Sequence, residues 1–184
     1  MKFIETPIPG LLIIEPKVFS DSRGYFFESF TELKFAENNI KNRFVQDNES
    51  KSNRGVIRGL HYQLSPFSQT KLIRVVHGTV YDVAVDLRKG SPTFGKWFGI
   101  EASAENKLQL YIPRGFAHGF SVLRDDTIFT YKCDNFYHQP AERGIRFDDP
   151  FLGIDWKIPK KEMIISEKDA KNPPFHDAKM NFNY

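Results

Sequence analysis

The sequence predicts a mainly β protein, a sandwich or barrel of jelly-roll type with a few short peripheral helices. Three observations predict it: apolar segments are short, Gly and Pro separate them at close intervals, and helix signals are rare. No repeat, low-complexity stretch or interdomain linker interrupts the chain. Because 184 residues are enough to bury one core, we expect residues 1–184 to form a single domain.

The expected strands follow one another in order. They lie at 11–14, 25–30, 44–48, 54–63, 71–76, 80–87, 96–102, 108–112, 118–123 and 127–133. A short helix is expected at 32–38, capped by Thr31, and Ser166 begins another near the C-terminus. His77-Gly78 predicts a hairpin turn. The polar tail at 171–184 is expected to lie along the surface or to fray.

Composition excludes several classes of protein. The net charge is only +3, without a dense basic stripe, so we expect no nucleic-acid partner. No long apolar run is present, so we expect neither a signal peptide nor a membrane span. Cys133 is the only cysteine, which leaves no intrachain disulfide. We therefore expect a cytoplasmic protein.

The stretch 54–63 places arginines and a histidine in what is otherwise a buried strand. A buried histidine is most often a satisfied structural group, so His61 alone is weak evidence for function. Strict alternation puts Arg58 and His61 on opposite faces. If both face one pocket, the strand must depart from its period, and Gly59 is the obvious site for a bulge. We predict irregular pairing near Gly59.

A second histidine lies in a recognisable motif. The run Pro-Arg-Gly-Phe-Ala-His at 113–118 resembles the second motif of the cupins, small jelly-roll barrels in which this histidine is commonly a metal ligand. The first cupin motif supplies two histidines and a carboxylate, whereas the matching strand here has only His61. His77, His138 and His176 lie in turns or in the tail, so they do not complete a ligand set. We expect a cupin-like barrel without a metal.

Other side chains suit proton abstraction beside a carbonyl group. Histidine is a good general base near neutral pH, and tyrosine can deliver a proton. Lysine can stabilise an oxyanion, and arginine binds phosphate oxygens. Together these functions point to a phosphorylated or nucleotide-linked carbonyl compound as substrate. The candidates are His61, His118, Lys71, Tyr131, Arg58 and Arg23.

Ordered sequence blocks along nearly the whole chain identify a family. They lie at 22–28, 46–48, 55–63, 71–75, 82–88, 91–95, 112–120, 131–133, 153–156 and 165–169. These blocks resemble the dTDP-4-dehydrorhamnose 3,5-epimerases, cupin-like enzymes of dTDP-L-rhamnose biosynthesis. The resemblance implies epimerisation at C3 and C5 of dTDP-4-dehydro-6-deoxy-D-glucose to dTDP-4-dehydro-L-rhamnose, without a cofactor.

The resemblance also implies the catalytic roles. His61 is the base that removes the protons beside the C4 ketone, and Asp169 holds His61 in the required tautomer. Lys71 stabilises the enolate oxygen. Tyr131 returns a proton from the face opposite His61, because inversion requires the base and the acid on opposite faces of the ring.

The remaining site positions are implied for substrate binding. Arg23, Arg58 and Lys168 meet the charged groups of the substrate, chiefly the diphosphate, and Phe26 stacks on thymine. The other positions are Glu28, Gln46, Asp47, Asn48, His118 and Glu142. The family forms homodimers through its N-terminal strands, and the partner can contribute to the nucleotide site. We therefore expect a homodimer that binds a dTDP-linked 4-keto-6-deoxy sugar.

Three alternatives remain open at this point. A relative that epimerises one carbon, or acts on another nucleotide-linked 4-keto sugar, differs in loop residues whose effect the sequence does not disclose. A metal-dependent cupin oxygenase predicts bound iron or another transition metal. A non-catalytic sugar-binding cupin predicts no deuterium incorporation from solvent at C3 or C5.

Overall fold

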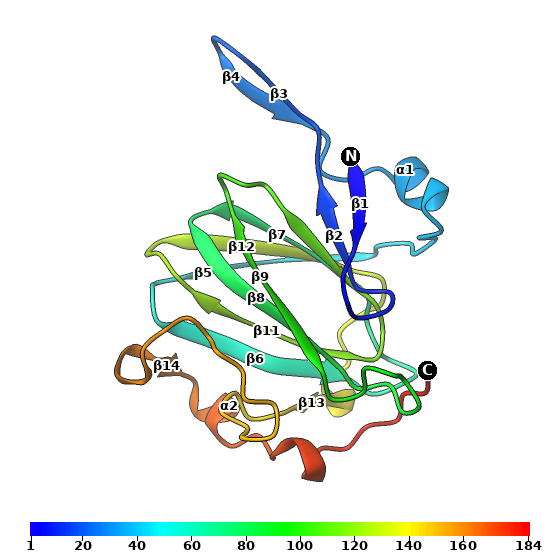
Figure 1. The fold of residues 1–184 in the computed structure, drawn as a ribbon, viewed down its shortest axis with the longest axis vertical. Coiled ribbons are helices and arrows are strands. Elements are labelled where there is room, and N and C mark those ends of the chain that lie inside the picture. The colour runs from blue at the N-terminus through cyan, green and yellow to red at the C-terminus, as the bar shows by residue number, and fades with distance from the viewer.

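The computed structural model describes residues 1–184, and its core consists of two facing β-sheets (Figure 1). In the first, six-stranded sheet the spatial order is β1 (Lys2–Glu5), β2 (Leu12–Glu15), β10 (Gln109–Ile112), β7 (Lys71–His77), β12 (Thr127–Cys133) and β5 (Gln46–Ser52). In the second sheet the order is β13 (Glu142–Gly144), β6 (Val56–Gln63), β11 (Phe116–Val122), β8 (Thr79–Asp86) and β9 (Trp97–Ser103), and β14 (Ile164–Ile165) pairs with β6. The mainly β, cupin-like jelly-roll prediction is confirmed.

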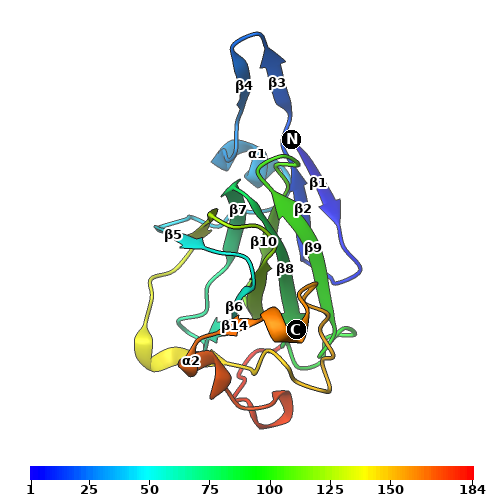
Figure 2. The ribbon, with the colours of Figure 1, turned by 90° about the vertical axis from the view of Figure 1, so that its left-hand side faces the viewer.

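The other elements are short and peripheral. A two-stranded hairpin of β3 (Val18–Asp21) and β4 (Gly24–Phe27) projects from one end of the barrel (Figures 1 and 2). The helices are α1 (Glu32–Glu37) and α2 (Glu167–Ala170), with single 3-10 turns η1 (Gln139–Ala141), η2 (Lys160–Glu162) and η3 (Phe175–Asp177). None of these helices has the length and apolarity that crossing a membrane requires.

The core has two main layers, one on each face of the second sheet. Alternate residues of β8 supply both: Val80 and Ala84 pack between the sheets, while Val83 and Val85 face outward. The outward layer is covered by the C-terminal third of the chain. This explains why β8 is apolar on both faces, as strands buried on two sides are.

The tail does not fray. Phe175 and Phe182 are buried in the outer core layer. The backbone of Lys89 pairs with that of Phe182 and Tyr184, which ties the last residues to the loop after β8. The prediction of a surface-packed tail is confirmed and that of fraying is wrong, because the apolar side chains within the polar tail pack into the outer core layer.

Three local predictions are wrong. The turn at His77-Gly78 does not close a hairpin, since β7 and β8 belong to different sheets and the positive φ of Gly78 lets the chain cross between them. The strand expected to end at Phe30 ends at Phe27. Thr31 makes no side-chain cap, unlike Ser166, whose hydroxyl accepts from the Asp169 amide at 3.1 Å.

Candidate active site

A cavity of about 630 Å³ opens between the two sheets. Strands β5, β6, β7, β11 and β12 form its walls, and the segment from β14 to α2 closes one side. The polar and ionisable side chains around it are Asn48, Glu49, Ser50, Arg58, His61, Lys71, His118, Tyr131, Ser166, Lys168 and Asp169. This is the place where the predicted catalytic side chains meet.

Strand β6 contributes two of them because its pairing breaks at Gly59. His61 pairs with His118 and Arg58 with Phe120, so β6 uses one residue more than β11 over the same span. Gly59 has φ 123°, and the peptide bond after it is cis. A Cβ at Gly59 would lie 2.6 Å from the Cα of Gly119. The predicted irregularity is confirmed, and it lets Arg58 and His61 line the same cavity.

His61 forms a close pair with Asp169 of α2. Its Nε2 lies 2.7 Å from Oδ1 of Asp169, and the Gly59 amide donates to Oδ2 at 3.3 Å. Burial raises the pKa of Asp169, but the hydrogen bond and charge of His61, with the Gly59 amide and Ser166, outweigh burial and hold that pKa below its ordinary value. A charged Asp169 keeps the proton on Nε2 and leaves the lone pair on Nδ1.

Lys71 and Tyr131 lie on neighbouring strands of the opposite sheet. The ammonium of Lys71 lies 5.6 Å from the centroid of the Tyr131 ring and makes no hydrogen bond or ion pair within the chain. Burial lowers the pKa of Lys71, only partly offset by Cys133, Asp82 and Glu142. Burial raises the pKa of Tyr131, so its phenol stays protonated at neutral pH. The cavity therefore holds an unpaired amine beside a neutral phenol.

A polar rim of Gln46, Tyr137 and Glu142 adjoins the cavity. Tyr137 and Glu142 line a neighbouring pocket that shares His61, Lys71, His118 and Tyr131 with it. Glu142 accepts hydrogen bonds from the Tyr137 hydroxyl at 2.9 Å and from Lys168 at 2.7 Å. Gln46 accepts from the Tyr137 amide at 3.0 Å and donates to Asn48 at 3.1 Å. Tyr137 was absent from the sequence-based prediction. Its only signal was an exposed aromatic pair, Phe136-Tyr137, just before Pro140.

The second cavity histidine, His118, contacts a carboxylate that the sequence analysis also missed. His118 Nε2 lies 2.9 Å and 3.1 Å from the two carboxylate oxygens of Asp82. Asp82 is completely buried on β8. Its signal was a lone carboxylate inside the apolar run 80–85. Nowhere does the chain gather three or more His, Cys, Asp or Glu side chains that could hold a metal ion.

Comparisons with known proteins identify the family. The family profile described as dTDP-4-dehydrorhamnose 3,5-epimerase matches residues 5–177.

The chain belongs to this family.

Three relatives illustrate its place within the epimerase family. The dTDP-4-dehydrorhamnose 3,5-epimerase of Shigella flexneri is 56% identical over 97% of this chain and 98% of its own. A crystal structure of dTDP-6-deoxy-D-glucose-3,5-epimerase from Legionella pneumophila, in complex with dTDP-4-keto-L-rhamnose, is 50% identical with a TM-score of 0.92, covering 96% of this chain and 93% of that one. A 3′-monoepimerase from Streptomyces bikiniensis in complex with dTDP-quinovose is 34% identical with a TM-score of 0.86, covering 93% and 86%.

Some positions that the epimerase family implies do not reach this cavity. Arg23 is 88% exposed on the hairpin and pairs with Asp21, and Phe26 beside it is 70% exposed. Glu28, just after β4, pairs with Lys34 at 2.6 Å. The hairpin that carries Arg23 and Phe26 projects from the barrel (Figures 1 and 2), and Arg23, Phe26 and Glu28 are all absent from the cavity wall.

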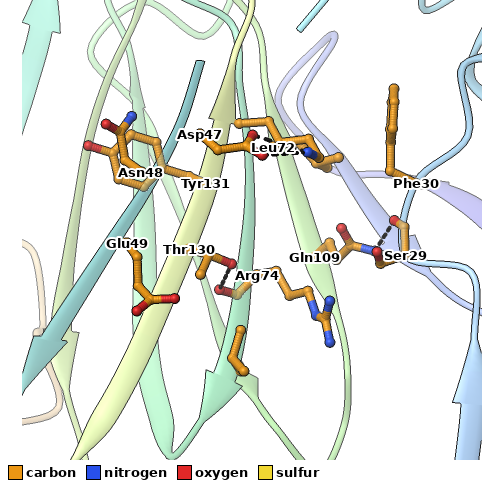
Figure 3. Close-up of a pocket in the computed structure, with 12 residues that line it drawn as sticks. Ser29, Phe30, Asp47, Asn48, Glu49, Leu72, Arg74, Gln109, Thr130 and Tyr131 are labelled. Carbon is orange, nitrogen blue, oxygen red and sulfur yellow. Dashed lines mark hydrogen bonds and ion pairs between the residues drawn. The ribbon is translucent and has the colours of Figure 1, made fainter. Parts of the chain in front are cut away.

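Asp47 also lies outside the cavity. It alternates with Asn48 along β5, so it points to the outer face of the sheet and pairs there with Lys132 at 3.0 Å. A separate groove of about 380 Å³ lies on that face, with Asp47, Arg74 and Thr130 in its walls (Figure 3). The expected substrate contact of Asp47 is therefore not made from within this cavity.

Proposed function

We propose that this protein epimerises dTDP-4-dehydro-6-deoxy-D-glucose at C3 and C5 to give dTDP-4-dehydro-L-rhamnose. The observation that carries the proposal is the meeting of a carboxylate-held histidine with a buried lysine and a protonated tyrosine in one cavity. A base, an oxyanion partner and an acid are the three groups that inversion beside a ketone requires. The family membership supplies the nucleotide sugar.

In the proposed mechanism Nδ1 of His61 takes the proton from C3, and the electrons pass to the C4 oxygen as an enolate. The ammonium of Lys71 stabilises that oxygen, because opposite charges attract strongly in a buried site. The Tyr131 hydroxyl then gives its proton to the opposite face of the carbon, and the ketone forms again. His61 then passes its proton to solvent and Tyr131 regains one from solvent, so that the same groups can repeat the sequence at C5. One proton is taken and one returned in each inversion, so no cofactor is consumed.

Arg58 and Lys168 are proposed to bind the diphosphate. The guanidinium of Arg58 contacts only the Ser52 hydroxyl, at 3.1 Å and 3.2 Å, and has no carboxylate partner. Its charge is free to meet an anionic group above His61. Gln46, Asn48 and Glu142 form the adjoining rim and are proposed to contact the polar parts of the substrate.

We further propose that the working unit is a homodimer in the cytoplasm. The projecting hairpin carries three strongly exposed aromatic residues, Phe19, Tyr25 and Phe26, a surface that isolated chains rarely leave open. Placed over the cavity of a second copy, the hairpin would supply Arg23 and Phe26 to the nucleotide. This accounts for residues that one chain holds away from its own site.

Deuterium exchange tests the proposed function. Wild-type protein with dTDP-4-keto-6-deoxyglucose in deuterium oxide should incorporate label at both C3 and C5, as followed by NMR. His61→Ala should abolish exchange at both carbons, whereas His77→Ala, at an exposed position at the end of β7, should retain it. Absence of exchange by the wild type would refute the proposal.

A monoepimerase is the second candidate, because the 3′-monoepimerase relative shares the fold at a TM-score of 0.86. The same experiment separates the two activities. Label at only one carbon would assign this protein to the single-carbon group.

A further inference from the structure

His118, which lines the cavity, forms a deeply buried ionisable pair with Asp82. His118 is 6% exposed and Asp82 is fully buried. Both carboxylate oxygens lie within hydrogen-bond distance of one ring nitrogen, Nε2, at 2.9 Å and 3.1 Å. Asp82 makes no other side-chain hydrogen bond. Because an unpaired charge is costly inside a protein, the buried carboxylate of Asp82 keeps its one donor, the Nε2–H group of His118, in a hydrogen bond.

This geometry determines which atom of His118 a ligand meets. With the Nε2 proton held by Asp82, the remaining ring nitrogen is Nδ1, which makes no hydrogen bond within the chain. Burial lowers the pKa of His118, and the charge of Lys71 lowers it further, while Asp82 opposes both. The ring is therefore neutral at pH 7, and Nδ1 carries a lone pair.

We propose, building on the proposed function, that Asp82 is a positioning residue that fixes His118 as a hydrogen-bond acceptor for a hydroxyl of the substrate's sugar ring. A lone pair on Nδ1 repels an enolate oxygen and attracts a hydroxyl. Lys71, which has no partner, is left as the donor for the oxygen. Lys71 thereby binds the ketone oxygen and His118 binds the neighbouring hydroxyl of the sugar. These two contacts orient the sugar ring against His61, which pairs with His118 across β6 and β11.

The first test measures the tautomer and needs no turnover. ¹⁵N NMR of histidine-labelled wild-type protein at neutral pH should show His118 as the neutral Nε2–H form, with the signal assigned by its loss in His118→Gln. In Asp82→Asn the new side-chain amide can donate to Nε2 of His118. Without the carboxylate that holds the Nε2 proton, the Nδ1–H tautomer of His118 should gain population. Asp134→Asn, a buried carboxylate away from the cavity, should leave the His118 signals unchanged.

A wild-type His118 that is Nδ1–H or doubly protonated would overturn the proposal, even if Asp82→Asn fails to fold. Because this measurement is independent of activity, it stands or falls separately from the epimerase assignment.

The second test asks whether a hydroxyl is recognised. Substrate analogues that lack the 2- or the 3-hydroxyl are compared by their rates of deuterium exchange at C5. For one of the two analogues, the kcat/KM of the wild type should be about 10-fold lower than for the full substrate. His118→Ala should use that analogue and the full substrate equally well. Asp82→Asn should lower kcat/KM for the full substrate by roughly 10- to 100-fold.

Two results would contradict the inference. If His118→Ala and wild type discriminate equally against both analogues, His118 recognises no hydroxyl. If His118→Ala loses exchange at one carbon and keeps it at the other, His118 is a second base.

Discussion

The proposed base and the proposed acid lie on different sheets. His61 lies on β6 with its Nε2 committed to Asp169 at 2.7 Å, so only Nδ1 can accept a proton from substrate. Tyr131 lies on β12 of the facing sheet. A ring bound between the sheets presents opposite faces to these two side chains. In the proposed mechanism, inversion of configuration follows because one sheet supplies the base and the facing sheet supplies the acid.

Replacement of the proposed acid should separate exchange from inversion. In Tyr131→Phe the base remains, so label should still enter the substrate at a measurable rate, while little inverted product forms. NMR of the recovered sugar measures both. Tyr111→Phe, a buried tyrosine whose hydroxyl bonds Asn42 away from the cavity, serves as the control and should retain both activities. Equal loss of exchange and inversion would show that Tyr131 serves binding instead.

The buried amine of Lys71 should limit activity at alkaline pH. Burial lowers its pKa below the 10.5 of an ordinary lysine, while burial raises the pKa of Tyr131 above its ordinary 10.0. The active ammonium form is therefore present below the lowered pKa and is lost as pH rises through it. A plot of kcat/KM against pH should fall on its alkaline side below pH 10.5. The residual deuterium exchange of Tyr131→Phe should fall over the same alkaline pH range. A profile that falls only above pH 10.5 would contradict the role of Lys71.

Two elements act together to hold His61, the proposed base. The Ser166 hydroxyl caps α2 by accepting from the Asp169 amide, which holds the short helix in place beside β6. The bulge at Gly59 turns the Gly59 amide toward Asp169 and Arg58 toward the cavity. The alignment of His61 therefore depends on a helix start and a strand irregularity that come from opposite ends of the chain.

Gly59→Ala should be strongly destabilising. The added Cβ would meet the Gly119 Cα at 2.6 Å and the His118 carbonyl at 2.8 Å, both backbone atoms, at a φ that side chains rarely adopt. We expect a loss of roughly 3–5 kcal/mol in the free energy of unfolding, measured by urea denaturation. Gly90→Ala, also at positive φ but with open space around the Cβ, should cost only about 1 kcal/mol. Similar losses in the two variants would show that close packing at Gly59 is unimportant.

For the whole molecule, the hairpin and the cavity point to assembly. Arg23 and Phe26 belong to the β3–β4 hairpin, which projects from the barrel (Figure 2), and neither lines the cavity that they are proposed to complete. The proposed two-fold dimer would bring them there, because each hairpin could then cover the site of the other copy.

Mixing two inactive variants tests whether Arg23 acts on the partner's site. Arg23→Ala and His61→Ala homodimers are each expected to be impaired. After unfolding and refolding together, mixed dimers contain one site with both native side chains. About a quarter of all sites should then be restored, as measured by product formation. Variants refolded separately and then combined provide the control. No recovery in the mixture would place Arg23 with the His61 of its own chain.

Much of this architecture follows from local patterns. Short apolar runs separated by Gly and Pro place most strands to within a few residues, because alternation and turn chemistry are properties of neighbouring residues. The predicted break at Gly59 is confirmed for the same reason: Arg58 and His61 conflict with period 2 unless the strand bulges. The hairpin prediction at His77-Gly78 is wrong, since a turn signal does not say which strands pair across it.

Residue types and their spacing were enough to predict the mainly β fold and the family, and the resemblance to that family pointed to His61, Lys71 and Tyr131, which the structure brings to one cavity. The tertiary structure was needed to show that Asp82 pairs with His118, that Tyr137 bonds Glu142, that Asp47 faces outward and that Arg23 lies on a hairpin outside the cavity. Each of these depends on which face a side chain occupies and on which distant strand lies beside it, and those are set by the packing of the whole chain.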